Sequence, residues 1–162
     1  MDDIDKVADQ WKKEKPHLGT QPMEILGRMM RLQKHIEVEI AACHKQYDLT
    51  FGEFDVLATL RRSGEPFNLT PSALLSSMML TSGAMTNRLD KLQAKGLIER
   101  VHSTEDRRSV SVGLTEKGFA IIDAAIEEHV RVQHKLVEQL SDANKPELNR
   151  LLKTWLAAFE GE

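Results

Sequence analysis

Apolar residues recur every three or four positions over most of the chain, which is the spacing of one face of an α-helix. Five segments show this pattern and are predicted to be helical: residues 3–15, 22–47, 51–63, 115–140 and the segment opened by Pro146. Pro16 stops the first of these helices, and Thr50 is suited to cap the third. The sequence therefore predicts a mainly helical protein with long amphipathic helices at both ends.

The segment between the third and the fourth of these helices contains two short helical stretches. Thr70 is suited to cap the first, and Pro71 occupies the first helical position, which proline favours. Thr81 or Ser82 is suited to cap the second, which runs to Lys95 and is ended by the glycine that follows. This spacing predicts a helix-turn-helix.

Two extended runs, LIERVH and VSVGL, follow at once and are separated by the polar segment STEDRRS. Val110, Val112 and Leu114 alternate along the second run, which predicts a β-hairpin. The predicted fold class is thus α+β: mainly α with a small β-hairpin wing, a winged helix-turn-helix between N- and C-terminal helices. Because these outer helices carry more apolar surface than the small module can cover, we expect them to form a dimerisation region with a second copy.

The second helix of the helix-turn-helix has two distinct faces. At 100° per residue, Met85, Leu89 and Leu92 face the core. The opposite side holds small or hydrogen-bonding residues, as entry into a DNA major groove requires, although a solvated polar face is the alternative. The predicted DNA contacts of this element are Thr81, Ser82, Gly83, Ala84, Thr86, Asn87 and Lys91.

Arg107 and Arg108 lie at the predicted tip of the hairpin, after Asp106. An arginine there can enter the minor groove beside the recognition helix, drawn by its negative potential. The alternative is a charged turn that keeps the hairpin soluble. We favour the first interpretation and add both arginines to the predicted DNA contacts.

Charge is distributed unevenly along the chain. The whole sequence has a formal net charge of −3, with 41% hydrophobic and 29% charged residues, as in ordinary globular proteins. Residues 82–118 nevertheless hold seven basic and five acidic side chains, a local charge of +2. Because phosphate neutralisation is local, a basic face suffices for DNA binding.

The sequence shows no nucleophile elbow, phosphate loop, cofactor fingerprint or cluster with metal-ligand spacing. We therefore expect that the protein is not an enzyme and that it has neither a cofactor nor a metal site. Cys43 is the one cysteine and lies on an apolar helix face, where cysteine is usually a small hydrophobe, although a redox sensor is the alternative. With neither a signal peptide nor a transmembrane stretch expected, we predict a cytoplasmic protein without a membrane partner.

The stretch LTPSALLSSMMLTSGAMTNRLDKLQAKGLIERVHSTEDRRSVSVGLTEKG resembles the MarR family of transcription regulators. The resemblance implies a single MarR-type domain over residues 1–162, with 1–47 and 115–162 for dimerisation and 50–114 as the DNA-binding lobe. It also implies a homodimer whose two recognition helices enter successive major grooves of a palindromic operator, roughly 34–36 Å apart. A helical interaction module without DNA is the less favoured alternative.

The segments QPMEILGRMMRLQKHIEVEI, FGEFDVLATLRRSG and MLTSGAMTNRLDKL resemble the PecS-like, urate-responsive subgroup of that family. This resemblance implies an effector site made by Trp11, Asp55, Arg88 and Arg100. The chemistry agrees, because an indole can stack on a purine, guanidinium groups bind an anion, and a carboxylate accepts from ring N–H groups. Alternatives are that Trp11 only packs, that Asp55 and Arg88 form a structural ion pair, and that the effector is another phenolic or aromatic anion.

Overall fold

The chain divides into two compact units, Met1–Ala42 (unit 1) and Cys43–Glu162 (unit 2), and each is described by itself. The structure is a computed structural model that describes residues 1–79, 85–102 and 110–160. The predicted caps Thr81 and Ser82 lie outside these residues. Within the described ranges, no helix is both long and apolar enough to cross a bilayer.

Unit 1 holds α1 (Asp3–Glu14) and most of α2 (Gln21–Lys45), close to the predicted boundaries. Asp2 caps α1, and its carboxylate receives the Arg28 guanidinium from α2 at 2.9 Å. This hydrogen bond from Arg28 lowers the pKa of Asp2 to about 2. Arg28 also pairs with Asp5, and Arg31 of α2 pairs with Asp3 at 3.1 Å, so ion pairs hold the first turn of α1 against α2.

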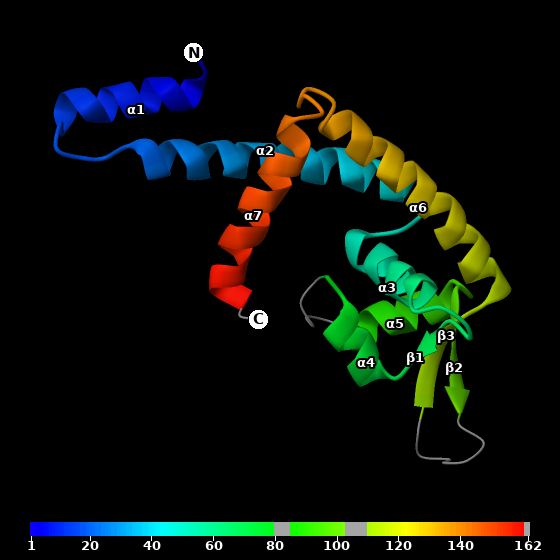
Figure 1. The fold of residues 1–162 in the computed structure, drawn as a ribbon. Helices are drawn as coiled ribbons and strands as arrows, with labels where there is room; N and C mark the ends of the chain where they lie inside the picture. Colours follow the sequence, from blue (N-terminus) through cyan, green and yellow to red (C-terminus); the bar gives the residue numbers. More distant parts are fainter. Residues whose placement is uncertain (80–84, 103–109, 161–162) are drawn as a thin grey trace. The chain divides into compact units, whose positions relative to one another are not determined.

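Unit 2 contains the helices α3 (Phe51–Arg62), α4 (Pro71–Ser77), α5 (Met85–Ala94), α6 (Glu116–Leu136) and α7 (Asn144–Glu160). The short helices α3, α4 and α5 lie together beside a small sheet (Figure 1). Thr50 and Thr70 cap α3 and α4 as predicted, since each hydroxyl accepts from a backbone N–H three residues on. Gly96 follows α5 with φ +70°, the left-handed conformation that glycine adopts readily at a helix end.

The sheet has three antiparallel strands in the order β1-β3-β2. Strands β2 (Ile98–His102) and β3 (Val110–Leu114) form the predicted hairpin, with Arg100 opposite Val112. Strand β1 (Asn68–Leu69) pairs with β3 on the other side and was not predicted, because two residues are too few to show an alternating pattern. The structure thus confirms the mainly helical class with a small β wing.

The hydrophobic core of unit 2 lies between α3, α5, α6 and the sheet. Leu89 and Leu92 of α5 are buried in it and Met85 packs against it, as the helical spacing predicted. The buried core residues are Leu49, Phe54, Val56, Leu57, Leu60, Leu74, Leu89, Leu92, Leu97, Ile98, Val112, Ile122 and Ala125. This core connects the recognition helix and the base of the wing to the same scaffold.

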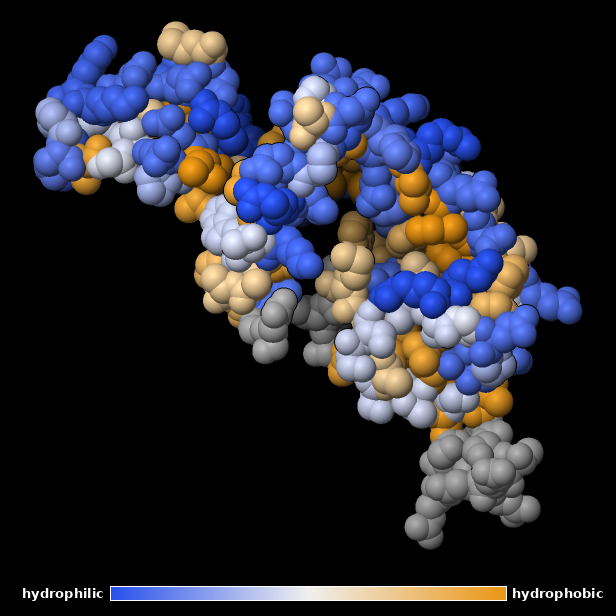
Figure 2. All heavy atoms as spheres, viewed as in Figure 1, coloured by the Kyte–Doolittle hydropathy of each residue, from blue (hydrophilic) through white to orange (hydrophobic). Residues whose placement is uncertain are grey.

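The predicted end of the helix over residues 115–140 is wrong. Helix α6 ends at Leu136 rather than at Leu140, because Val137 leaves helical geometry and the chain turns there. Leu75 of α4 is 39% exposed, whereas Leu74 beside it is fully buried, so only one leucine of that pair faces the core. Val130 of α6 and Val137, which follows its last residue, are both 40% exposed. Hydrophobic residues also reach the visible surface of the molecule (Figure 2).

Candidate functional site

Helix α5 presents polar side chains on the face opposite its core leucines. Thr86, Asn87 and Lys91 are exposed, and Leu89 and Leu92 are buried on the other side. Side chains that can donate and accept hydrogen bonds therefore point away from the fold, as contact with DNA requires. The other predicted DNA contacts lie outside the described residues: Thr81, Ser82, Gly83, Ala84, Arg107 and Arg108.

An ion pair between the buried Glu53 of α3 and Lys95, the residue that follows α5, connects the two helices. The side chain of Glu53 is 3% exposed, and its carboxylate lies 3.1 Å from Lys95 Nζ. The same carboxylate accepts the backbone N–H of Thr50 at 2.9 Å, which completes the capping box of α3. Glu53 thus serves two elements at once, and the sequence analysis did not find this role.

A hollow of about 350 Å³ lies beside this ion pair. Its lining residues are Lys45, Asp48, Leu49, Thr50, Glu53, Lys91 and Lys95. Three of these are lysines, of which Lys95 is paired with Glu53 and lies 3.4 Å from the Asp48 carboxylate. Lys91 and Lys45 therefore supply the positive charge of this surface, next to the predicted recognition face.

Arg100, a predicted effector residue, lies on β2 and reaches the recognition helix. Its guanidinium lies 2.8 Å from the Asp90 carboxylate and also donates to the side chain of Gln93. Asp90 and Gln93 are one turn apart on α5, so one arginine bridges two side chains of the helix. This contact connects the wing to α5, a role that the sequence analysis did not assign to Arg100.

Asp55 and Arg88, also predicted effector residues, both belong to unit 2. Asp55 of α3 is 6% exposed, and its carboxylate accepts the backbone N–H of Met79 at 3.4 Å. Arg88 of α5 is partly buried, and its guanidinium lies against Gly52, one turn before Asp55 on α3. The structure therefore places the Arg88 side chain of the recognition helix against α3, at the edge of the core.

Trp11, the fourth predicted effector residue, belongs to α1 in unit 1 and is 40% exposed. Ala8, one turn earlier, is buried. The exposed indole is thus accessible as a stacking surface.

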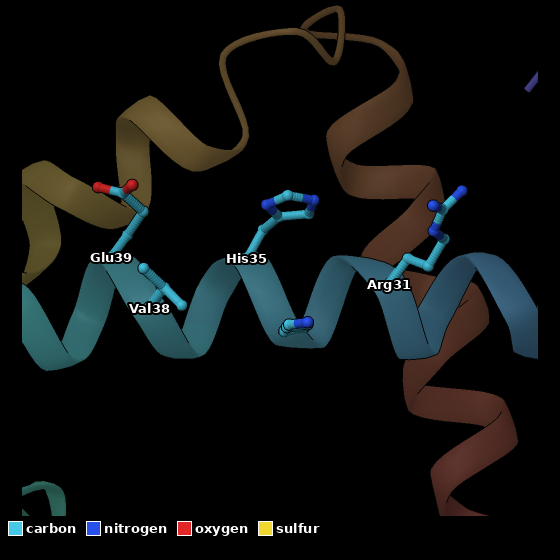
Figure 3. Close-up of a pocket in the computed structure, with 5 residues that line it drawn as sticks. Arg31, His35, Val38 and Glu39 are labelled. Atoms are coloured by element: carbon cyan, nitrogen blue, oxygen red, sulfur yellow. The ribbon is translucent and has the colours of Figure 1, made fainter.

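A second hollow, of about 410 Å³, runs along α2 and is lined by Arg31, Lys34, His35, Val38 and Glu39. Arg31, His35 and Glu39 are four residues apart and project from the same side of the helix (Figure 3). None of the four predicted effector residues lines this hollow.

Three aromatic rings, those of His44, Phe54 and His129, stack on one another in unit 2. His44 is fully buried and stacks on Phe54, with ring centroids 3.9 Å apart, while its Nε2 lies 3.0 Å from His129 Nδ1. Phe51 packs against the same ring. Burial, with a smaller contribution from His129, lowers the pKa of His44 to about 4, so both rings are neutral at pH 7. Local sequence patterns do not predict this contact, because the two histidines are 85 residues apart.

Cys43 is buried beside this cluster, at 2% exposure. Burial raises the pKa of its thiol, and the Glu128 carboxylate raises it further. A buried thiol with a raised pKa is a weak nucleophile, which agrees with the interpretation of Cys43 as a small hydrophobic residue.

Comparison with known proteins gives a consistent result. The family model described as MarR family matches residues 49–110. The regulator PecS of Dickeya dadantii is 35% identical over 150 residues, which cover 93% of this chain and 90% of PecS. The solved structure of a mutant Escherichia coli MarR complexed with operator DNA has a TM-score of 0.69 and 26% identity, over 90% of this chain and 97% of that one.

A third similar protein is BpsR of Bordetella bronchiseptica, with a TM-score of 0.70 and 21% identity over 86% of this chain and 96% of that one. Its structure is described as showing regulation of DNA binding by 6-hydroxynicotinic acid. At this level of identity the likeness shows the fold alone.

The helix-turn-helix, the hairpin that follows it and the polar face of α5 define a winged-helix DNA-binding protein. Its relatives are transcription regulators rather than enzymes. The chain belongs to the MarR family of DNA-binding transcription regulators.

Proposed function

We propose that this regulator is a repressor that binds a palindromic operator as a homodimer and is released from it by urate or a related anionic purine. The observation that carries the proposal is the place of Arg88. This cation belongs to the recognition helix, yet its side chain lies against α3 rather than on the exposed face with Thr86 and Asn87. A ligand that binds Arg88 therefore acts directly on the element that reads DNA.

We propose Trp11, Asp55, Arg88 and Arg100 as the effector contacts. A planar anionic purine needs a stacking surface, cationic donors and an acceptor for its ring N–H groups, and these four residue types supply them. The similarity to PecS over 93% of the chain supports the assignment, since the PecS-like regulators are the group that the sequence resembles. Arg100 pairs with Asp90 of α5, so an anion bound at Arg100 also competes with the Asp90 carboxylate for the guanidinium.

The proposed mechanism is a displacement of α5. An anion attracts the guanidinium of Arg88 and repels the carboxylate of Asp55, so the recognition helix shifts relative to α3. In a dimer, such a shift changes the separation of the two recognition helices and hence their fit to successive grooves. Allosteric coupling of about 1–3 kcal/mol weakens DNA binding about 5- to 150-fold.

We propose that residues 1–47 and 115–162 supply the dimer contacts and that residues 50–114 form the DNA-binding lobe. In the single chain, none of the residues of α7 is buried, although one of its faces is apolar. An apolar face of this size is typical of an interface with a second copy. Because the partner is operator DNA, we place the protein with the chromosome in the cytoplasm.

The second candidate effector is another phenolic or aromatic anion, which the same residue types can bind. BpsR, whose DNA binding is described as regulated by 6-hydroxynicotinic acid, favours including this class. Oxidation of Cys43 is disfavoured, since the buried thiol has a raised pKa.

The test is a titration of operator binding with urate. We expect the purified protein to bind an inverted-repeat duplex from its own upstream DNA, with an affinity that falls steeply between low and moderate salt. Urate is expected to weaken that binding about 5- to 150-fold in the wild type, and the Arg88→Ala variant is expected to lose most of this response.

The controls are a scrambled duplex, 6-hydroxynicotinate as a second anion, and Lys34→Ala, which removes a cation from unit 1. A wild type that keeps its operator affinity at saturating urate would contradict the urate proposal. A response to 6-hydroxynicotinate alone would favour the second candidate.

A further inference from the structure

Gly52 occupies a crowded position in the first turn of α3. It is buried, and its nearest neighbours outside its own helix are side-chain atoms of Arg88. A methyl group in place of the Gly52 hydrogen would lie 2.8 Å from Cζ and 2.9 Å from Cδ of Arg88, and closer still to Nε. These distances are shorter than van der Waals contact allows, so position 52 and Arg88 cannot both keep their places if residue 52 has a side chain.

The flexible partner of this contact is the arginine. The atoms that a methyl group at position 52 meets are near the end of the Arg88 side chain, which has several rotatable bonds. Gly118 provides a contrast, because a methyl group there would lie 2.8 Å from the backbone carbon of Leu97 and closer still to its carbonyl oxygen. A side chain at position 52 therefore displaces the Arg88 guanidinium, whereas one at position 118 displaces backbone.

The elements on both sides of Gly52 are fixed in place. The first turn of α3 is closed by the capping box of Thr50 and Glu53. Glu53 also pairs at 3.1 Å with Lys95, the residue that follows α5 and lies seven positions after Arg88. The ion pair holds the recognition helix at a fixed position against α3. The space beside Gly52 then determines where the Arg88 guanidinium lies.

We propose that Gly52 is a positioning residue for effector recognition, because its missing side chain leaves the space that the Arg88 guanidinium occupies in the effector-responsive state. This inference rests on the proposed function of Arg88 as an effector contact. It adds a residue that touches neither effector nor DNA and that decides whether the cation is available in the right place.

The experiment compares Gly52→Ala, Arg88→Ala and the double variant with the wild type, using urate as the probe. For each protein, the ratio of operator dissociation constants with and without saturating urate is measured, so that any change in basal affinity divides out. The melting temperature and the NMR signal of the Arg88 Nε–H group are recorded on the same samples. Gly19→Ala is the control, since no heavy atom beyond its own chain neighbours lies within 4 Å of the added methyl group.

We expect Gly52→Ala to lose the urate response as Arg88→Ala does, and the double variant to lose no more than either. The Arg88 Nε–H signal is expected to shift in Gly52→Ala and to stay in place in Gly19→Ala. We expect the melting temperature of Gly52→Ala to stay close to that of the wild type, because the higher helix propensity of alanine offsets the contacts that Arg88 loses when it is displaced.

Three results would overturn the inference, in different ways. If Arg88→Ala loses the response and Gly52→Ala keeps it, Gly52 does not position Arg88, and the proposed function stands. If neither variant changes the response, the proposed role of Arg88 is wrong and the inference is wrong with it. An Arg88 Nε–H signal that does not move in Gly52→Ala excludes the displacement whatever the urate response is.

Discussion

His44 and His129 meet in the interior of unit 2 as neutral rings, in contact with Phe54. In the folded protein the pKa of His44 is about 4, against about 6.5 for an unperturbed histidine, because the buried ring is poorly solvated when charged. The folded state thus binds fewer protons than the unfolded state between these two values. The stabilisation is complete above pH 6.5 and is lost as the pH falls toward 4.

We therefore expect the free energy of unfolding to fall by up to about 1.4 kcal/mol per pH unit from His44 over this window, with His129 acting in the same direction. Urea unfolding at a series of pH values measures it. His44→Phe keeps an aromatic ring without the titrating nitrogen and should flatten the dependence. The exposed His17, changed to phenylalanine, is the control, and an equal slope in His44→Phe and wild type would show that other groups cause it.

At the scale of elements, the orientation of the recognition helix depends on the contact between α3 and α5. Glu53 is the residue that joins them, since its buried carboxylate both caps α3 and pairs with Lys95. Removal of the Glu53 carboxylate takes a charge-assisted hydrogen bond from each of its two partners. The carboxylate therefore constrains the position of α5 relative to α3.

We expect Glu53→Ala to lower the free energy of unfolding by about 1–3 kcal/mol, which is typical when a hydrogen bond to a charged group is lost. Glu53→Gln should lose less, because the amide can still accept the Thr50 N–H. Chemical unfolding measures both, and operator affinity measured in parallel reports the effect on α5. The matched control is Glu127→Ala, an exposed position on α6. A Glu53→Ala protein as stable as this control would mean that the ion pair contributes nothing.

At the scale of the whole molecule, the apolar face of α7 points to the proposed dimer. Leu152 and Trp155 are 40% and 39% exposed in the single chain, which is unusual for side chains of this size. We expect Leu152→Glu combined with Trp155→Glu to weaken the dimer at least tenfold, because each large apolar side chain contributes about 1.5–3 kcal/mol when buried. Light scattering over a dilution series measures the assembly. Lys153→Glu is the control on the same helix, and a double variant that stays as dimeric as the wild type would place the interface elsewhere.

Local patterns predicted much of the fold and less of the site. The 3.6-residue periodicity located the helices, and the hydroxyl-bearing caps Thr50 and Thr70 marked where α3 and α4 begin, since both signals depend on neighbours in sequence. Contacts between distant positions could not be predicted from such patterns: Glu53 with Lys95, and the stacked histidines. Each requires two helices to be brought together by a core that no single segment describes.

The unequal pairing along β3 has a mechanical consequence for the wing. Gly113 and Val112 have partners in both neighbouring strands, whereas Val110 and Ser111 are joined to β2 alone. The hairpin is thus clamped on two sides where it leaves the scaffold and on one side farther out. Within the described strands, the backbone of β3 is therefore restrained most strongly at Val112 and Gly113, so these two residues anchor the hairpin on the scaffold at a constant angle.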